Sequence, residues 1–474
     1  MTADRCAGGR LGVLHVSTAD LGGGAERVAW TLFQAHQARG ADAYLAVRTK
    51  RSADPRVLEI PNESRRSGWW RGWHRLEKWA LRRGVRFMPR LCRLAASPAA
   101  ELSRVRGRED FDFPGSRLLL ELPPRQPDVV HCHNLHGNYF DLRVLPDLSR
   151  RVPVILTLQD AWLLSGHCIH SFDCERWKTG CGECPDLSIP VEIPRDATAF
   201  NWRRKQAIYA ASRLHVATSC RWMLRKVEQS MLAPGVVESR VIPNGVDLAV
   251  FRPADRPAVR GALDIPADAR VVLFAANGIR QNPWKDYRTL GAAAARVAED
   301  FSGRLLFVAL GEEAPPERIG RAEIRFVPFQ REPGQVARYY QAADVYAHAA
   351  RADTFPNTIL EALACGTPVV ATAVCGIPEQ VRGLRHPAAD PQESSYPPER
   401  ATGLLVPPGD AAALAAALGH LLGHDSLRER LGENAHADAC RRFGLDLQVE
   451  AYLEWYQNLQ ARPGALRLAQ ARGA

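Results

Sequence analysis

Two acidic residues, Asp353 and Glu361, stand eight positions apart, and a short loop leads from the first into an apolar run. The run predicts a helix that starts near Pro356 or Asn357. The free N–H groups and the positive dipole end of that helix would seat a phosphate or a sugar hydroxyl. Asp353 would then reach a bound sugar, and Glu361, one turn further on, would accept from the two hydroxyls of a ribose. The alternative is a capping acid and a solvated helical glutamate.

This stretch resembles the signature of the retaining family-4 glycosyltransferases of the GT-B fold: Glu, seven residues, Glu, then Ala-x-Ala-x-Gly-x-Pro-Val-Val. Asp353 stands in place of the first Glu and is one methylene shorter, which affects sugar identity or binding strength. The resemblance implies that Asp353 holds the donor sugar hydroxyls and that Glu361 binds the nucleotide ribose. The donor-binding residues that it implies here are Asp353, Thr354, Phe355, Pro356, Asn357 and Glu361.

Arg280 and Lys285 lie between a predicted strand and a predicted helix. They resemble the family's basic pair, which neutralises the nucleoside diphosphate leaving group without a metal. Lys285 is the last lysine of the chain although many arginines follow it, which favours a need for a compact ammonium there. The resemblance therefore implies that Arg280, Lys285 and Asp353 carry catalysis, and that catalysis needs no cofactor. Ordinary surface charge is the alternative.

A glycine-rich loop, Gly22-Gly23-Gly24-Ala25-Glu26-Arg27, follows the first predicted strand and precedes a helix. It resembles the first loop of this family, where the backbone comes close to the donor phosphate or to the acceptor. Gly23 and Gly24 are therefore expected to contact the donor.

Two further segments, residues 131–137 and 157–162, end predicted strands of the first half of the chain. The resemblance makes His136, Gln159 and Asp160 acceptor-side residues. Gln159 replaces a family histidine, so it keeps hydrogen-bonding capacity but cannot carry a proton. Activity is still expected, because the departing phosphate oxygen can take the acceptor proton. For the two histidines at 131 and 133, we expect a structural role.

Four cysteines fall within seventeen residues and end in Cys-x-x-Cys: Cys168, Cys174, Cys181 and Cys184. Four thiolates can hold one tetrahedral zinc ion and fix a loop that is too short to build a core. Such a site has no open position, so the metal would be structural; unmetallated thiols are the alternative. The spacing resembles a subgroup of family-4 enzymes from bacterial surface-polysaccharide clusters.

Positive charge is concentrated in one segment, because residues 65–108 hold 13 basic and 2 acidic side chains out of a formal net charge of +10. Within residues 65–94, tryptophan and leucine recur at helical spacing and arginines fall toward the opposite face. Such a segment can lie on an anionic membrane, or it can be an ordinary surface helix. Gly84 and Pro89 divide it into two shorter helices. No recognition motif accompanies the charge, so we expect no nucleic-acid partner.

These residues must be positioned by an α/β architecture, since apolar strand-like runs alternate with helical stretches in both halves of the chain. Two tandem Rossmann-like domains are therefore predicted, facing across a cleft as in the GT-B fold. We expect an acceptor-side domain over residues 1–238 and a nucleotide-sugar domain over residues 239–444, with a helix at about 445–462 packing back on the first. The tail after Pro463 is expected to fray.

The composition agrees with a folded protein of 474 residues, with 46% hydrophobic and 24% charged side chains. No run has the length of a membrane span or of a signal peptide, so we expect a cytoplasmic protein, peripheral at the inner face of the cell membrane if residues 65–94 bind lipid.

The expected function is transfer of a sugar from a nucleoside diphosphate donor to an acceptor hydroxyl with retention, in bacterial polysaccharide or glycolipid assembly. A membrane contact through residues 65–94 would favour a lipid-linked acceptor. One alternative is a soluble small-molecule acceptor such as a secondary metabolite. Another is a catalytically silent protein that binds a nucleotide sugar; the departures from the family pattern at Gln159 and Asp353 suggest it.

Overall fold

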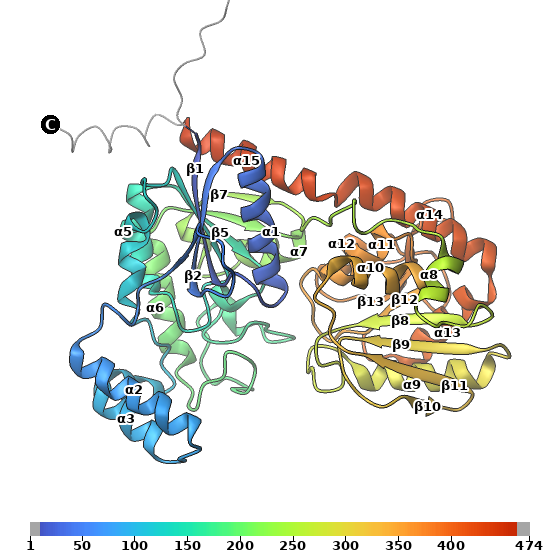
Figure 1. The fold of residues 1–474 in the computed structure, drawn as a ribbon, viewed down its shortest axis with the longest axis horizontal. Helices are drawn as coiled ribbons and strands as arrows, with labels where there is room; N and C mark the ends of the chain where they lie inside the picture. Colours follow the sequence, from blue (N-terminus) through green and yellow to red (C-terminus); the bar gives the residue numbers. More distant parts are fainter. Residues whose placement is uncertain (1–9, 462–474) are drawn as a thin grey trace, which may run out of the picture. The chain divides into compact units, whose positions relative to one another are not determined.

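The computed structural model describes residues 10–461, which form two compact units. Unit 1 takes in the chain up to Ser219, then Met223–Ile242 and the chain from Val449 onward. Unit 2 consists of Cys220–Trp222 and Pro243–Gln448. Each unit is built on its own seven-stranded sheet with helices on its faces (Figure 1). The expected tail after Pro463 lies outside the described residues.

The sheet of unit 1 is wholly parallel, which is the pattern of a Rossmann-like domain. Four of its inner strands are buried along almost their whole length, because helices cover both faces of a parallel sheet. The strands, in spatial order, are β3 (Val57–Glu59), β2 (Asp42–Thr49), β1 (Gly12–Ala19), β4 (Val129–His133), β5 (Val154–Leu158), β6 (Leu214–Thr218) and β7 (Val236–Val241).

The helices of unit 1 connect these strands or pack over them. The α-helices are α1 (Gly24–Ala38), α2 (Gly68–Arg82), α3 (Met88–Ala96), α4 (Pro98–Val105), α5 (Leu145–Arg151), α6 (Thr198–Ala210) and α7 (Arg221–Glu228). Short 3₁₀ turns are η1 (Pro114–Glu121), η2 (Leu142–Val144), η3 (Trp162–Leu164), η4 (Arg176–Lys178) and η5 (Ala233–Gly235). The last helix, α15 (Leu445–Gln460), belongs to unit 1 from Val449 onward.

The sheet of unit 2 is also parallel, except that its edge strand β10 pairs antiparallel with β11. In spatial order the strands are β10 (Glu317–Ile319), β11 (Ala322–Val327), β9 (Leu305–Leu310), β8 (Arg270–Ala275), β12 (Val345–His348), β13 (Val369–Thr372) and β14 (Gly403–Val406). The helices are α8 (Arg256–Ala262), α9 (Tyr287–Asp300), α10 (Pro333–Ala342), α11 (Asn357–Ala364), α12 (Ile377–Gln380), α13 (Ala411–Gly423) and α14 (Asp425–Arg442). This is a second Rossmann-like domain.

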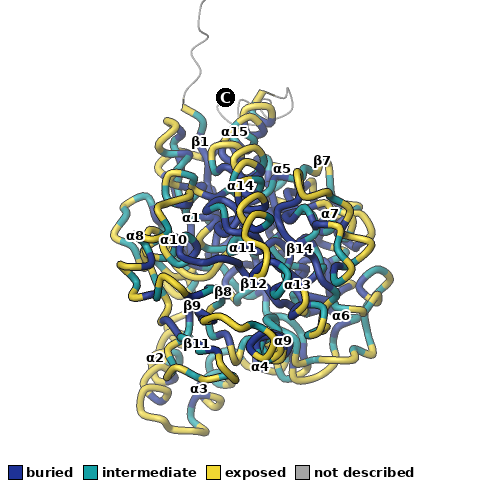
Figure 2. The backbone as a smooth tube through the Cα atoms, turned by 90° about the vertical axis from the view of Figure 1, so that its right-hand side faces the viewer, coloured by how far each residue is buried: buried dark blue, intermediate teal, exposed yellow. Residues whose placement is uncertain are grey.

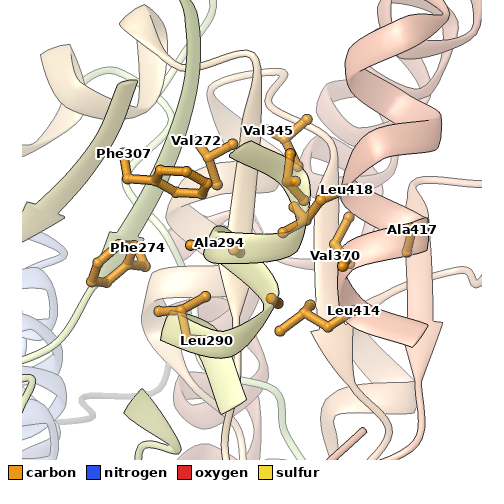
Figure 3. Close-up of a cluster of buried hydrophobic side chains, with 14 of the residues drawn as sticks. Val272, Phe274, Leu290, Ala294, Phe307, Val345, Val370, Leu414, Ala417 and Leu418 are labelled. Carbon is orange, nitrogen blue, oxygen red and sulfur yellow. The ribbon is translucent and has the colours of Figure 1, made fainter. Parts of the chain in front are cut away.

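The core of unit 2 lies between the sheet and helices α9 and α13 (Figure 3). Phe307 and Val272 come from the strands, Leu290 from α9 and Leu418 from α13, and all are buried. Asp286 caps α9, because its carboxylate accepts a hydrogen bond from the Thr289 backbone N–H at 3.1 Å. The cap and the packed face fix the direction in which the loop before α9 leaves the sheet.

Helices α2, α3 and α4 form an excursion of unit 1, with α2 and α3 lying side by side (Figure 1). Gly84, with a φ of 68°, ends the turn after α2, and Pro89 lies in the first turn of α3. Much of this excursion is exposed (Figure 2). No helix within residues 10–461 combines the length and apolar character of a bilayer span.

Candidate functional site

Two loops at the carboxyl edge of the unit 2 sheet are joined through their backbones. The loop after β8 meets the loop after β12 at an antiparallel bridge between Lys285 and Ala350. The Asp286 N–H donates to the Ala349 carbonyl at 3.1 Å, and the Arg351 N–H donates to the Trp284 carbonyl at 2.9 Å. Ligands of open α/β sheets bind at this edge, so the loops hold side chains where a ligand is expected.

Lys285, Asp353 and His348 form one contact group across these loops. The Lys285 ammonium forms an ion pair with the Asp353 carboxylate and lies 3.2 Å from Nε2 of His348. Burial alone would raise the pKa of Asp353, but Lys285 and His348 outweigh it and hold that pKa well below its ordinary value. Burial, together with the charge of Lys285, lowers the pKa of His348 to about 4. At neutral pH the group is therefore a cation, an anion and a neutral imidazole.

Glu361 lies in the second turn of α11, which begins at Asn357 as the sequence predicts. The Glu361 side chain is buried, and the Tyr340 hydroxyl donates to its Oε2 at 3.0 Å. Pro356 precedes the helix and, within the described chain, no side chain caps its N-terminus. Asn357 is held from outside the helix, because the Asn244 amide donates to its Oδ1 at 3.0 Å.

Thr354 and Phe355 are both buried in the loop between Asp353 and Pro356. The Thr354 carbonyl lies 3.6 Å from the Cys220 thiol, and a Cβ on Gly376 would come within 2.3 Å of the same carbonyl. The backbone that follows Asp353 is therefore tightly held.

Arg280 occupies a different place from Lys285. Its guanidinium forms ion pairs with Glu312, which follows β9, and with Glu317 at 3.2 Å. The structure thus brings Lys285 and Asp353 into contact but holds Arg280 on two carboxylates. A diphosphate would have to compete with those carboxylates for Arg280. Sequence reasoning missed Glu312, Glu317 and His348 because no spacing relates them to the motif residues.

Gly23 and Gly24 lie at the exposed start of α1 in unit 1, with Gly23 as the N-cap. Neither glycine has a positive φ, and a Cβ on Gly24 would meet nothing within 4 Å. A Cβ on Gly23 would lie 3.1 Å from Oε2 of the flexible Glu26 side chain, so neither backbone strain nor a backbone clash requires glycine at these two positions.

His136 and Asp160 come together at the carboxyl ends of β4 and β5. Nε2 of His136 lies 2.8 Å from Oδ2 of Asp160. Burial would lower the pKa of His136, but the Asp160 carboxylate outweighs it and raises that pKa above its ordinary value. Gln159 precedes Asp160 and is half-buried. The imidazole of His136 is therefore oriented by Asp160, the residue next to Gln159.

His131 and His133 belong to a fully buried cluster that also contains His15 and His36. His15 bonds to His133 and to His36, each at 3.1 Å, and His131 bonds to the Tyr456 hydroxyl of α15 at 2.6 Å. These contacts anchor the C-terminal helix. His15 and His36 were not singled out from the sequence, because His15 lies inside an apolar strand and His36 in a helix with no motif around it.

The four cysteines lie in an irregular segment between η3 and α6 whose one regular element is η4. All four are free thiols of intermediate exposure. Burial raises the pKa of Cys181 to about 12, and the nearby Cys168 and Cys174 add to that shift, so three of the thiols are neighbours. Nε2 of His167 lies 3.4 Å from Sγ of Cys184.

Comparison with known proteins places both units in described families. Residues 22–250 match the family model Glycosyltransferase Family 4, and residues 269–424 match Glycosyl transferases group 1. The chain is 30% identical over 321 residues to D-inositol 3-phosphate glycosyltransferase 1 of Catenulispora acidiphila, covering 63% of this chain and 69% of that protein. It is 35% identical over 232 residues to D-inositol 3-phosphate glycosyltransferase of Actinosynnema mirum, covering 46% of this chain and 51% of that protein. The chain thus spans about half the length of some of its curated relatives.

Solved structures share the whole fold at low identity. Sucrose-phosphate synthase of Thermosynechococcus elongatus superposes with a TM-score of 0.61 at 19% identity, over 95% of this chain and 100% of that one. Anabaena HepE in complex with UDP and glucose gives 0.58 at 16% identity, over 94% and 100%. These similarities identify the fold. The chain belongs to the family-4 glycosyltransferases and has the two Rossmann-like domains of the GT-B fold.

Proposed function

We propose that this chain transfers a sugar from a nucleoside diphosphate sugar to an acceptor hydroxyl with retention of the anomeric configuration. The observation that carries the proposal is the contact of Lys285 with Asp353 beside a neutral His348, at the carboxyl edge of the unit 2 sheet. A cation and an anion held together can serve the two chemically different parts of such a donor. Diphosphate oxygens need positive charge, and sugar hydroxyls need acceptors.

In this proposal Lys285 binds the donor diphosphate and stabilises the negative charge that develops as the bond to the anomeric carbon breaks. Asp353 accepts hydrogen bonds from the sugar hydroxyls, and its ionised state at neutral pH keeps it an acceptor. Glu361 accepts from the ribose hydroxyls, oriented by Tyr340. Arg280 adds a second cation when it leaves Glu312 and Glu317.

Retention is proposed through attack from the face on which the leaving group departs. The acceptor oxygen forms a bond to the anomeric carbon while the bond from that carbon to the phosphate oxygen breaks. The acceptor proton passes to the departing phosphate oxygen, so no protein base is required where Gln159 replaces histidine.

The acceptor is proposed to be part of a bacterial polysaccharide or glycolipid, linked to a lipid at the membrane surface. The exposed side chains of α2 and α3 support this: Trp69 is 65% exposed, Phe87 84% and Leu91 62%, among many arginines. Tryptophan and arginine on one surface fit an anionic lipid headgroup layer. The names of the curated relatives favour a soluble alternative, a phosphorylated polyol.

We also propose that Cys168, Cys174, Cys181 and Cys184 hold one structural zinc ion. Zinc would link an irregular segment that has little core of its own. Within residues 10–461, no three of the four cysteine sulfurs lie within 4.8 Å of one another, whereas the ligand atoms of His15, His131 and His133 do. A zinc ion would therefore have to draw the cysteine sulfurs closer together. Left-handed backbone at Cys181 and Glu183, with φ of 51° and 46°, already turns the Cys-x-x-Cys loop sharply.

The function is tested by calorimetry with UDP and GDP, followed by a donor-hydrolysis assay on a panel of nucleotide sugars. Binding of one nucleotide with slow hydrolysis of its sugar is the expected result. Nucleotide binding with no turnover of any donor would favour the catalytically silent alternative, and no nucleotide binding at all would refute the proposal.

A further inference from the structure

Unit 1 contains a cavity of about 1720 Å³ whose use the donor site does not explain. Typical small-ligand cavities measure roughly 300–1,000 Å³, so this one exceeds the need of a single sugar. It runs from the strand ends of the sheet to the inner side of helices α2–α4. Residues that mark its walls are Arg48, Asn62, Trp70, His136, Trp162 and Ile193.

The cavity wall is held by specific contacts. Arg66 forms an ion pair with Asp112, which fixes the start of the helical excursion to the body of unit 1. The Asn62 amide donates to the Tyr139 carbonyl at 2.9 Å, and its Oδ1 accepts from the Gly115 N–H at 2.9 Å. These contacts fix the segment that leads from the body of unit 1 into α2.

At the strand-end side, Arg48 is bound to the residue that follows His136 in the chain. The Arg48 guanidinium donates to the Gly137 carbonyl at 2.6 Å. His136 is held through Nε2 by Asp160, and its Nδ1 has no hydrogen-bond partner among residues 10–461. An oriented nitrogen and an ordered guanidinium therefore both remain able to contact a ligand in the cavity.

Half of the eight basic side chains on the wall are held in ion pairs, and Arg48 is not among them. Acidic and basic side chains are equally frequent on the lining, eight of each, so net charge does not select an anion. On the helical wall, Arg93 pairs with Glu77 at 2.8 Å and Arg104 with Glu101 at 2.6 Å. Arg48 has no carboxylate within 4 Å in the described part of the chain, although it stands where the strands end.

We infer that this cavity is the acceptor site and that it takes an acceptor carrying a phosphate, which Arg48 binds. The inference rests on the proposed transfer reaction and names its substrate class. A guanidinium with free N–H groups binds phosphate bidentately, and a phosphate bound there would place neighbouring hydroxyls beside His136. The volume beyond Arg48 holds the rest of the acceptor. The phosphate belongs either to a lipid-linked diphosphate or to a free phosphorylated polyol.

The experiment measures thermal stabilisation of the full chain, saturated with UDP so that phosphate cannot bind at the donor residues. The probes are myo-inositol 3-phosphate, farnesyl diphosphate and unphosphorylated myo-inositol. Wild type and the matched variant Arg117→Gln, an exposed arginine of unit 1 outside the cavity, should bind a phosphorylated probe and not myo-inositol. Arg48→Gln should weaken that binding at least tenfold while its affinity for UDP stays unchanged.

The two phosphorylated probes identify the source of the phosphate. Preference for farnesyl diphosphate supports a lipid-linked acceptor, and preference for inositol phosphate supports a soluble one. Wild-type affinity in Arg48→Gln, or no probe binding while UDP binds normally, would overturn the inference. Loss of UDP binding in wild type would instead count against the proposed function.

Discussion

The Lys285 ammonium contacts the Asp353 carboxylate although 67 residues separate them in the chain, and His348 lies against both. This contact joins a cation that suits a diphosphate to an acid that suits a sugar. Because both side chains are largely buried, their charges act on each other and on a ligand with less screening than at the surface.

Replacing Lys285 by alanine should weaken UDP binding by about 1 to 3 kcal/mol, the scale of a lost charge-assisted hydrogen bond. Lys285→Arg should recover only part of the loss, because a planar guanidinium does not replace a compact ammonium. Calorimetry with UDP measures both. The exposed Arg288→Ala serves as control, and equal affinity of Lys285→Ala and this control would contradict the site.

Glu361→Ala should also cost about 1 to 3 kcal/mol of UDP affinity, and the loss should be specific to the ribose. Wild type is expected to prefer UDP to its 2′-deoxy analogue, because Glu361 would accept from the ribose hydroxyls. The variant should bind both with similar affinity. If Glu361→Ala still prefers UDP to the 2′-deoxy analogue, this buried glutamate has only a structural role in α11.

The wild-type protein should bind vesicles containing phosphatidylglycerol in low salt and release them in high salt, because arginine contacts with headgroups are screened. Phe87→Ser combined with Leu91→Ser should reduce binding several-fold. Phe329→Ser, which removes an equally prominent apolar side chain from unit 2, is the control. Vesicle binding that is absent in low salt would remove the lipid-linked version of the function.

The buried histidines predict loss of stability in acid. Burial lowers the pKa of His36 and His133 to about 3, whereas an unfolded histidine titrates near 6.5. The unfolded chain therefore binds more protons between pH 3 and 6.5, so stability falls as pH drops below about 6.5, by roughly 1.4 kcal/mol per pH unit for each such histidine. Urea unfolding at pH 7.5 and 5.5 measures this. His36→Leu should flatten the dependence and the exposed control His424→Gln should not. A pH-independent midpoint in wild type would refute the explanation.

Purified protein should contain one equivalent of zinc, released on unfolding and measured with a colorimetric chelator. Cys174→Ser should lower the metal content and the melting temperature, because zinc affinity contributes directly to folding. Cys440→Ser, an exposed cysteine of α14, should change neither. If purified wild-type protein contains no zinc, and added zinc does not change its melting temperature, the four cysteines are unmetallated thiols.

Most strands at the centre of the two sheets were predictable from the sequence to within two or three residues. Leu305–Leu310 is an uninterrupted apolar run and Val154–Leu158 is apolar except for Thr157, as expected of parallel central strands. The edge strands β3, β7, β10 and β14 were not recognised, since β3, β10 and β14 have only three or four residues and β7 contains Glu238, Ser239 and Arg240. Gly84 and Pro89 were sufficient to divide the basic segment into separate helices.

The candidacy of Asp353 and Glu361 was predictable from the sequence because one motif supplies both, although their roles stay predictions. The contact between Lys285 and Asp353 was not, because it depends on how two loops pair at a sheet edge. For the same reason the sequence could not place Arg280 on Glu312, nor Arg48 beside Gly137. Local spacing has no information about which distant loops meet.

The backbone bridge between Lys285 and Ala350 links the lengths of two loops to each other. One inserted residue on either side would shift the facing register by about 3.3 Å and separate the ammonium from its carboxylate. Insertions that surface loops usually tolerate should therefore be selected against in both at once. Divergence of sugar preference among descendants of this gene is left to exchanges of side chains, such as the aspartate now at position 353.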